Sequence, residues 1–434
     1  MTVEVSGAND LFSDRYMQDP YRVFAELRGV GPIHRAHIPS GIPVWVVTGR
    51  AEVSAALADT RLSKDSARLR AVIDRAMAAR LDGSQVAETV ATDMLNSDPP
   101  EHTRLRKLVV RGFSARRVER LRPLVEELTD ELLDAMAARA AGGTVDFVDA
   151  FAFSLPITVI CELLGIPRAD RRSFRAWSTV IVGASSRDEL RRATTAMGGY
   201  LVQMMAAKRS APADDLLSDL VEASDAGDRL SPLELVSMAS LLLIAGHETT
   251  VNLLGSSLLA LLQHPDQFAK LRARPELIDA TVEEVLRYNS PAPVTTWRYA
   301  KEPMTVGDAR IAANDIVLLA LGAANHDGHI PDPDAFDIER QNTGHLSFGH
   351  GIHFCVGAAL ARMEAQVALG RLVERFPGIA LAVPADALRW RPSVVMHGLA
   401  ALPVRLGPRD AGPRQPTTRA VPDSGAAETE ARQR

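Results

Sequence analysis

Apolar residues recur along most of the chain with the spacing of amphipathic helices. Between residues 118 and 141 they fall at every third or fourth position, and Gly142 and Gly143 then form a typical helix end. Residues 149–164 are predicted to form a second, buried helix that stops at Gly165. The pattern as a whole predicts a mainly α-helical protein.

Some stretches depart from this spacing. Residues 30–48 are rich in glycine and proline ahead of the apolar run 44–47, which predicts a short strand pair joined by a turn. Residues 60–98 are loosely patterned and are predicted to form a long loop with short helices. At the ends, we expect residues 1–10 to be flexible and residues 408–434, which contain almost no large apolar side chain, to be a disordered tail.

The clearest single element begins at Ser231. Serine at the N-cap, Pro232 at the first helical position and Glu234 at the third form a capping box. No pair of helix breakers follows until His264 and Pro265, so the helix has about 32 residues and a length of about 48 Å. Because it is apolar on most faces, it is expected to cross the centre of one large domain over residues 11–407.

Composition narrows the class of protein. The 434 residues are 46% hydrophobic and 24% charged, with a net charge of −5, which argues against non-specific binding of nucleic acid. Two cysteines rule out a disulfide scaffold. The start of the chain has no apolar targeting segment, and no window reaches the 18–20 apolar residues, roughly, that a membrane span needs. We expect a soluble, cytoplasmic protein.

The second cysteine stands in a glycine-rich motif, Phe348-Gly349-His350-Gly351-Ile352-His353-Phe354-Cys355-Val356-Gly357. A predicted helix follows at once, and its free N–H groups and positive dipole end favour a thiolate at Cys355. The glycines let the backbone turn closely around a bulky group, and Phe348 and Phe354 would shield the sulfur. Such a sulfur suits an axial ligand of haem iron. The alternative is an inert buried cysteine.

Polar residues interrupt the long apolar helix at its middle. Buried charges such as His247 and Glu248 are costly unless they are paired or used. The hydroxyl of Thr249 can bond back to the carbonyl of Ala245 and bend the helix. Gly246 lets a flat ligand approach the backbone, dioxygen would occupy the gap beside Thr249, and Glu248 would relay protons. The alternatives are a tolerated core threonine and a salt-bridged helix acid; His247 is left without a role.

A zinc site is a competing interpretation of the same residues. His345, His350, His353 and Cys355 cluster tightly, and His247-Glu248 begins like the H-E-x-x-H motif. That motif requires a second histidine where this chain has Val251, and zinc would not account for the long helix.

Four segments, in order, resemble the cytochrome P450 family. They are residues 98–106 (D-P-P-E-H-T-R-L-R), 241–250 (L-L-L-I-A-G-H-E-T-T), 284–287 (E-V-L-R) and 348–357, which matches F-G-x-G-x-H-x-C-x-G at every fixed position. The resemblance covers about residues 10–405. Within the family, the chain is similar to soluble bacterial class I members that tailor macrolides, other polyketides and steroid-like compounds. The resemblance implies a mainly α fold with small β-sheets.

The resemblance also implies a set of site residues. Haem b would be bound through Cys355 as metal ligand, with His102, Arg106, Gly246, Arg298, Phe348, His353 and Gly357 as further cofactor contacts. Glu248 and Thr249 would be the catalytic acid and alcohol.

Glu284 and Arg287 share a helix face and in isolation would form a surface ion pair. The resemblance makes them a buried structural pair with Arg340 as third member. His326 stands where the family often has arginine, which we expect to alter a contact on the proximal side.

The implied activity is insertion of one oxygen atom from O2 into a large, mainly apolar secondary metabolite, by hydroxylation or epoxidation. Electrons would come from NAD(P)H through ferredoxin and ferredoxin reductase, and the protein would be a monomer. A haem-binding sensor or carrier without oxygenation, or a peroxide-driven peroxygenase, is the alternative. Substrate identity and the carbon attacked are left open.

By the same resemblance, the substrate pocket draws on residues 64–96, 174–202, 241–249, 291–297 and 395–397. Its apolar members would be Met94, Leu95, Val182, Val294 and Met396, and its polar members Thr295, Thr296 and His397. The helix after Pro100 is locally basic and is predicted to dock an acidic ferredoxin through Arg104, Arg106, Lys107, Arg111, Arg116 and Arg117.

Overall fold

The computed structural model describes residues 11–78, 92–141, 143–182, 186–225, 230–341 and 344–407. The predicted flexible N-terminus 1–10, the predicted disordered tail 408–434, Gly142 and the side chain of Val182 lie outside the described residues.

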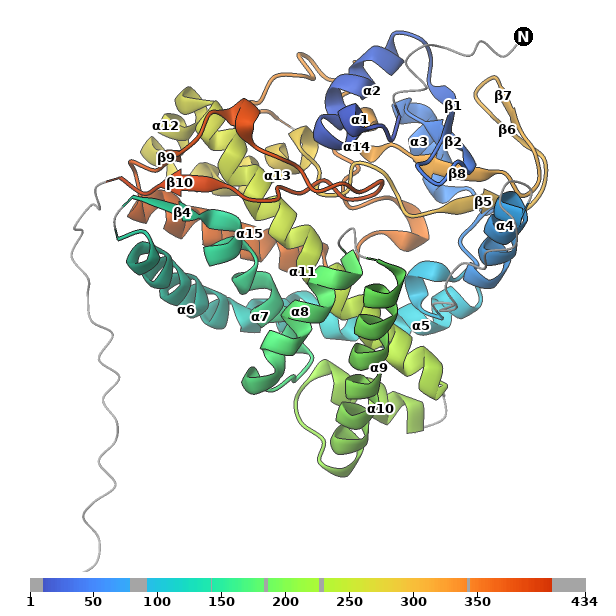
Figure 1. Cartoon of the computed structure of the whole chain (residues 1–434), viewed down its shortest axis with the longest axis horizontal. Coiled ribbons are helices and arrows are strands. Elements are labelled where there is room, and N and C mark those ends of the chain that lie inside the picture. The colour runs from blue at the N-terminus through green and yellow to red at the C-terminus, as the bar shows by residue number, and fades with distance from the viewer. Residues whose placement is uncertain are drawn as a thin grey trace, which may run out of the picture.

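Helices make up most of the described chain (Figure 1). In order, they are α1 (Asp14–Gln18), α2 (Pro20–Arg28), α3 (Arg50–Ala58), α4 (Ser66–Ala78), α5 (Glu101–Val110), α6 (Ala115–Arg139), α7 (Ser154–Leu163), α8 (Arg171–Val182), α9 (Arg187–Ser210), α10 (Leu216–Asp225), α11 (Pro232–Gln263), α12 (Pro265–Ala273), α13 (Ile278–Tyr288), α14 (Leu321–Asn325) and α15 (Ala358–Arg375).

The strands are short and form small sheets. They are β1 (Ile33–His37), β2 (Pro43–Val47), β3 (Leu62–Ser63), β4 (Thr144–Asp146), β5 (Arg298–Ala300), β6 (Met304–Val306), β7 (Ala309–Ile311), β8 (Ile316–Leu319), β9 (Ala380–Leu381) and β10 (Pro403–Arg405). The largest sheet has the order β1-β2-β8-β5-β3, with β2 and β8 parallel and the other pairs antiparallel. The fold is mainly α with small β-sheets, as predicted.

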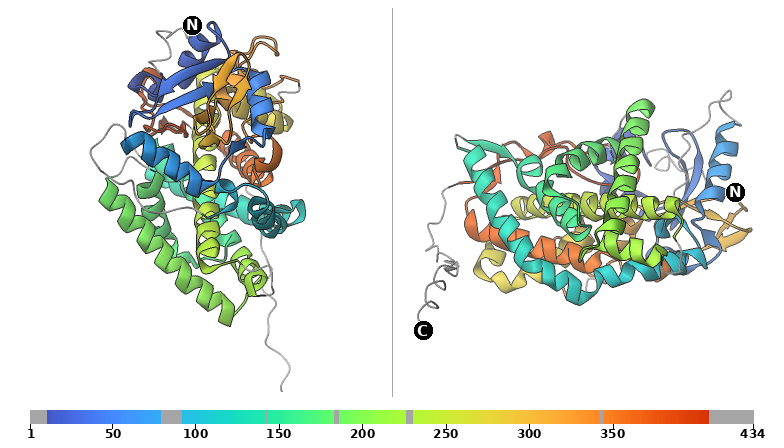
Figure 2. Two further views of the ribbon diagram at one scale, coloured as in Figure 1. Left: turned by 90° about the vertical axis from the view of Figure 1, so that its right-hand side faces the viewer. Right: turned by 90° about the horizontal axis from the view of Figure 1, so that it is seen from below.

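Helix α11 runs through the middle of the molecule and contacts α7, α9, α13 and α15 (Figures 1 and 2). Its 32 residues begin at the predicted capping box, where Ser231 accepts from the N–H of Glu234 and Glu234 accepts from that of Ser231. Its C-terminal half is buried on all sides from residue 250 to 261. The central position predicted for this helix is therefore confirmed.

The five-stranded sheet separates two apolar clusters. Successive residues of a strand point to opposite faces, so Val46 and Leu318 join one cluster while Val47 and Leu319 join the other. A third, larger cluster packs the helices around α11. The strand pair predicted within residues 30–48 is β1 and β2, in antiparallel register.

Other predicted elements differ in detail. The helix expected over residues 149–164 is divided at Phe153 into a wide helical turn, Val148–Ala152, and α7. The stretch 60–98 contains α4, with 13 residues, because its apolar positions 69, 72 and 73 pack as a helical stripe on the sheet. Within the described residues, no helix combines the length and the apolar character needed to cross a bilayer.

Candidate active site

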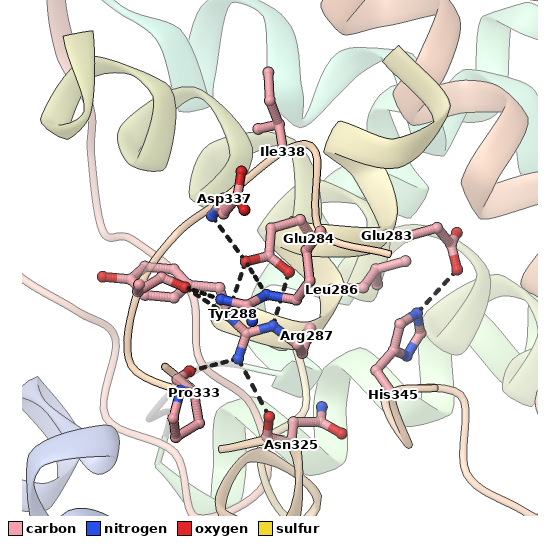
Figure 3. Close-up of polar contacts among 12 residues, drawn as sticks. Glu283, Glu284, Leu286, Arg287, Tyr288, Asn325, Pro333, Asp337, Ile338 and His345 are labelled. Atoms are coloured by element: carbon pink, nitrogen blue, oxygen red, sulfur yellow. Dashed lines mark hydrogen bonds and ion pairs between the residues drawn. The ribbon is translucent and has the colours of Figure 1, made fainter. Parts of the chain in front are cut away.

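The predicted Glu284–Arg287 pair is a buried ion pair on α13, so the alternative of a surface pair is wrong (Figure 3). Arg287 Nε and Nη2 donate to the two carboxylate oxygens of Glu284 at 2.7 and 2.8 Å. Its remaining N–H groups donate to the carbonyls of residues 325, 333 and 335, so every guanidinium donor is used. Arg340 Nε completes the group at 3.2 Å from Glu284 Oε1.

This ion pair is linked to the cysteine motif through Asn325. The Asn325 carbonyl accepts from Arg287, and its side chain accepts from the N–H of Leu346 at 2.7 Å and donates to Ser347 Oγ at 2.8 Å. Ser347 Oγ in turn donates to the carbonyl of Leu286 at 2.5 Å. The approach of the chain to Phe348 is therefore fixed from α13.

The motif itself folds as a tight loop ahead of α15. The N–H of Cys355 donates to the Phe348 carbonyl at 2.9 Å, and Gly349 and Gly351 have φ of +74° and +73°, a conformation that favours glycine. Burial raises the pKa of the Cys355 thiol, and the hydrogen bond from the N–H of Gly357 partly offsets this rise. The N–H of Gly357 at the helix N-terminus favours the thiolate, as expected, but burial outweighs it.

A second ion pair supports the loop from behind. Arg362 stands over the ring of Phe348, with 4.4 Å between its guanidinium carbon and the ring centroid. Its Nε and Nη2 donate to Glu283 at 2.6 and 2.9 Å, and His345 Nε2 lies 3.1 Å from the same carboxylate. Burial opposes ionisation of Glu283, but the two partners outweigh it and lower its pKa to about 2.

A cavity of about 920 Å³ lies between this loop and α11. Cys355, Phe348, Val356 and Gly357 line it on one side, and Thr249 and Glu248 line it on the other. Further lining residues come from the predicted pocket segments and include Met94, Leu95, Val294, Thr295, Thr296 and Met396. His397 does not line the cavity, and its expected place there is wrong, because its ring stacks on Trp390 at 3.7 Å and faces Tyr21.

The wall formed by α11 contains the predicted contact between a threonine hydroxyl and the helix backbone. The Thr249 hydroxyl donates to the Ala245 carbonyl at 3.0 Å, as expected. Gly246 lines the cavity, but the space of its missing side chain is taken by Ile160 of α7, whose Cδ1 would lie 2.8 Å from a Cβ. Close packing of the two helices therefore favours glycine here, and the expected approach of a flat ligand to Gly246 stays a prediction.

Basic side chains form one edge of the cavity. Lys64, Arg106, Arg298 and His353 all line it, and His102 is buried beside them with its ring 4.4 Å from that of His353. Burial, then the charges of Lys64 and Arg298, lower the pKa of His353 to about 2, and burial lowers that of Arg298 to about 10. Arg298 Nε and both ring nitrogens of His102 make no hydrogen bond of ordinary geometry.

These features fit a haem. A sulfur ligand stands in a largely apolar slot, and buried cationic groups with unused donors gather at one edge, where two carboxylates would satisfy them. Within the ranges the structure describes, no three His, Cys, Asp or Glu side chains converge as metal ligands, so His345, His350, His353 and Cys355 do not form the alternative zinc site.

Comparison with known proteins identifies the family. Residues 173–274 and 273–381 match the sequence model of cytochrome P450. Cytochrome P450 107B1 of Saccharopolyspora erythraea is 50% identical over 397 residues, which cover 91% of this chain and 97% of the relative. The chain belongs to the cytochrome P450 family.

Other relatives agree on the class of reaction. The 6-deoxyerythronolide B hydroxylase of the same organism is 45% identical to this P450, over 92% of this chain and 98% of the relative. The solved structure of the P450 monooxygenase TamI with tirandamycin C superimposes with a TM-score of 0.83 at 47% identity, over 91% of this chain and 99% of TamI. This chain is a cytochrome P450 monooxygenase of the hydroxylating or epoxidising type, and its family uses haem iron.

Some residues of this P450 site were not predicted. Lys64 is buried and donates to Thr296 Oγ1 at 2.7 Å, and burial together with Arg298 lowers its pKa well below the ordinary value. Its rarity in an arginine-rich chain was the available signal, since the sequence has lysine at only five positions. Arg391, which pairs with Glu248, gave no signal, because the two are 143 residues apart.

His326 does not line the cavity. Its Nδ1 lies 2.9 Å from the carboxylate of Asp334 and its Nε2 lies 2.9 Å from the carbonyl of Tyr288, behind the Glu284–Arg287 pair. The residue that departs from the family pattern therefore contacts the structural support of the site.

Proposed function

We propose that this P450 inserts one oxygen atom from O2 into a large, mainly apolar macrolide, other polyketide or steroid-like molecule. The observation that supports it most is the facing of Cys355 and Thr249 across one cavity of about 920 Å³. Such a volume is at the upper end for small-molecule sites, and it would hold the haem and the substrate together. Hydroxyl groups at Thr195, Ser237, Ser240 and Thr295 would orient oxygen-bearing groups of the substrate.

In this proposal, the loop and the basic edge hold haem b. Cys355 is the iron ligand, with Phe348 and Gly357 beside it. Arg106 and Arg298 offset the charge of the propionates, and His353 and His102 donate hydrogen bonds to them. We add Lys64 to this group because it lines the same edge. The bound haem supplies the chemistry that activates dioxygen and oxidises the substrate. The chain supplies the ligand, the protons and the placement.

Proton supply is assigned to α11. Thr249 and Glu248 both line the cavity, and the Thr249 hydroxyl donates to the Ala245 carbonyl. The Thr249 hydroxyl would turn from the Ala245 carbonyl to donate a hydrogen bond into the cavity, and the Glu248 carboxyl would deliver protons to it through water. Replacement of Thr249 with alanine is expected to divert reducing equivalents to hydrogen peroxide.

Electrons would come from NAD(P)H through a ferredoxin reductase and an acidic ferredoxin. On α5 and the start of α6, Lys107, Arg111 and Arg116 are exposed and have no ion-pair partner among the described residues. Val110 and Ile352, 45% and 47% exposed, add an apolar contact next to them. The other predicted members are engaged elsewhere, since Arg104 pairs with Glu234, Arg117 with Asp219, and Arg106 donates to the Phe354 carbonyl.

The central test is the spectrum of the reduced protein under carbon monoxide. A thiolate-ligated haem gives a far-red-shifted Soret band, and Cys355→Ser should abolish that band and turnover. A normal haem content with an unshifted band would contradict the assignment of the ligand. Retention of turnover in Cys355→Ser would contradict the proposed function itself.

Substrate class is tested by titration and product analysis. Spin-state shifts are measured with 6-deoxyerythronolide B, tirandamycin C, a steroid and, as control, a fatty acid, followed by turnover with a surrogate ferredoxin. Oxygenated product with a polyketide or steroid supports the proposal. Binding without product would favour the sensor or carrier alternative, and product with peroxide alone would favour the peroxygenase alternative.

Docking is tested by reversing charge at Arg111 and Arg116 together. Turnover supported by ferredoxin at low salt should fall by about tenfold, with an unchanged spin-state titration. A matched reversal at Arg120, which pairs with Asp214, should have little effect. Unchanged turnover in the Arg111/Arg116 variant would rule out this docking surface. A cytoplasmic location and a monomeric state stay predictions.

A further inference from the structure

The carboxylate of Glu248 is bound by a residue from a distant part of the chain. Arg391 Nη2 donates to Glu248 Oε1, and it also donates to Asn252 Oδ1, one turn further along α11, at 2.6 Å. The Glu248 side chain is 2% exposed and that of Arg391 is 33% exposed. Arg391 does not line the cavity, whereas Glu248 does. Glu248 therefore stands between the cavity and a group that reaches solvent on the other side.

The polar network around Glu248 is incomplete. Arg391 Nε, Asn252 Nδ2 and His247 Nε2 are buried without a hydrogen-bond partner. His247 Nδ1 lies 2.7 Å from the Leu243 carbonyl, so this nitrogen carries the proton and Nε2 is an acceptor, 3.9 Å from Glu248 Oε2. The unused donors of Asn252 and Arg391 give the Glu248 carboxylate alternative partners.

A glycine makes room for the Arg391 contact. The N–H of Arg391 donates to the Gly398 carbonyl at 2.8 Å, which pairs the two residues across a narrow loop. A Cβ at Gly398 would lie 2.0 Å from Asn252 Oδ1 and 2.8 Å from Arg391 Nη2. Any larger residue would therefore push the guanidinium away from Glu248.

The same loop touches the substrate cavity. Val395 and Met396, between Arg391 and Gly398, line the cavity. The loop is anchored at both ends: the backbone of Trp390 exchanges two hydrogen bonds with the Gln18 side chain, both 3.1 Å, and the N–H of His397 donates to the Pro291 carbonyl at 2.9 Å. A ligand that packs on Val395 and Met396 therefore presses on a short, anchored loop that also carries Arg391.

We propose that Arg391 is a positioning residue that holds Glu248 on the cavity wall beside Thr249, and that the loop 391–398 conveys occupancy of the cavity to this contact. The inference rests on the proposed role of Glu248 in proton supply. With the contact in place, the carboxylate has one orientation and a path toward solvent. Without it, the carboxylate turns to its other partners and proton delivery at Thr249 becomes slow.

The test compares holoenzymes of Arg391→Gln, Arg391→Lys, Gly398→Ala and Glu248→Gln. Arg389→Gln is the matched control, because Arg389 lies in the same segment but donates only to the carbonyls of residues 386 and 388. With 6-deoxyerythronolide B and tirandamycin C as probes, the readouts are product formed per NADPH, hydrogen peroxide released, the solvent isotope effect on product formation and the spin-state Kd.

We expect Arg391→Gln to lower product per NADPH by about fivefold and to raise peroxide and the solvent isotope effect. The spin-state Kd should stay within twofold of the parent value, and the Soret band under carbon monoxide should be unchanged. Arg391→Lys should recover at least half of the product yield, and Gly398→Ala should reproduce the loss although it keeps Arg391. The Arg389→Gln control should match the parent enzyme.

Two outcomes would overturn the inference. The first is that Arg391→Gln has a product yield and a solvent isotope effect within twofold of the parent while Glu248→Gln is impaired. The second is that Arg391→Lys gives no more product per NADPH than Arg391→Gln. If Glu248→Gln is also unimpaired, the proposed proton route itself fails. The two failures are thereby distinguished.

Discussion

Two glutamate–arginine pairs of this P450 differ in how many of their hydrogen-bonding atoms have a partner. In the Glu284–Arg287 pair both side chains are at most 1% exposed, and every guanidinium donor of Arg287 has a partner. In the Glu248–Arg391 pair the arginine is 33% exposed, and Arg391 Nε has no partner. The first pair joins neighbours on one helix, and the second joins α11 to a loop far along the chain.

The difference separates structure from function. A fully satisfied buried network has a single low-energy arrangement, so it can fix the loop that carries Cys355. A partly satisfied network next to a cavity has alternative arrangements of similar energy, which is what a group that moves protons needs. In these two pairs, the saturated network supports the cysteine loop, and the incomplete one borders the cavity.

The largest effect is expected for Arg287→Ala. Removal of Arg287 takes two hydrogen bonds from the buried Glu284 carboxylate and leaves the carbonyls of residues 325 and 333 without a partner, so the free energy of unfolding should fall by about 3–5 kcal/mol. Haem retention should fall with it, because the support of residues 346–348 is lost. Chemical denaturation monitored by circular dichroism measures the change. A loss below about 1 kcal/mol would contradict the structural role of the pair.

An intermediate effect is expected for Glu283→Gln. Glu283 has a pKa lowered to about 2 by Arg362 and His345, so its contribution to stability is present above its ordinary pKa near 4.5 and is lost as the pH falls toward 2. The substitution should cost about 1–2 kcal/mol near neutral pH and should flatten the acid side of the stability curve.

Unfolding midpoints between pH 7 and pH 2.5 measure this change. Glu339→Gln, on an exposed carboxylate held by Lys270 and Arg274, is a surface comparison. If the Glu283→Gln protein lost stability with acid as steeply as the parent, the pairing behind the cysteine loop would not be a source of stability.

The smallest effect on stability is expected for Arg391→Gln. Because the arginine is one-third exposed and the pair is only partly desolvated, the free energy of unfolding should change by less than about 1 kcal/mol. Product per NADPH should nevertheless fall, as proposed above. A stability loss as large as that of Arg287→Ala would remove the contrast between the two pairs.

Much of the fold could be predicted from local patterns. The capping box at Ser231 and the apolar run behind it located α11, because a helix start and a buried helix face both depend on residues close in sequence. The strand pair β1–β2 was located in the same way from its glycine and proline residues. The division of the segment 149–164 at Phe153 was missed, because its apolar spacing fits one continuous helix equally well.

The site could be predicted only in part. Cys355, Thr249 and Glu248 are found in motifs whose residues are adjacent in the chain. Lys64 and Arg391 lie in segments without such motifs, and their importance depends on what packs against them. The position of His397 was predicted wrongly, because its neighbours in the sequence, Val395 and Met396, do line the cavity while its own ring turns toward Trp390.

By itself, the sequence predicted most of the helices, the cysteine loop and the candidate groups for the chemistry, because these follow from spacing over a few residues. The tertiary structure alone decided which distant groups meet. Arg391 pairs with Glu248, Lys64 joins the basic edge of the cavity, and Ile160 fills the space beside Gly246. Contacts between distant segments arise from the packing of whole elements, and no local pattern contains that information.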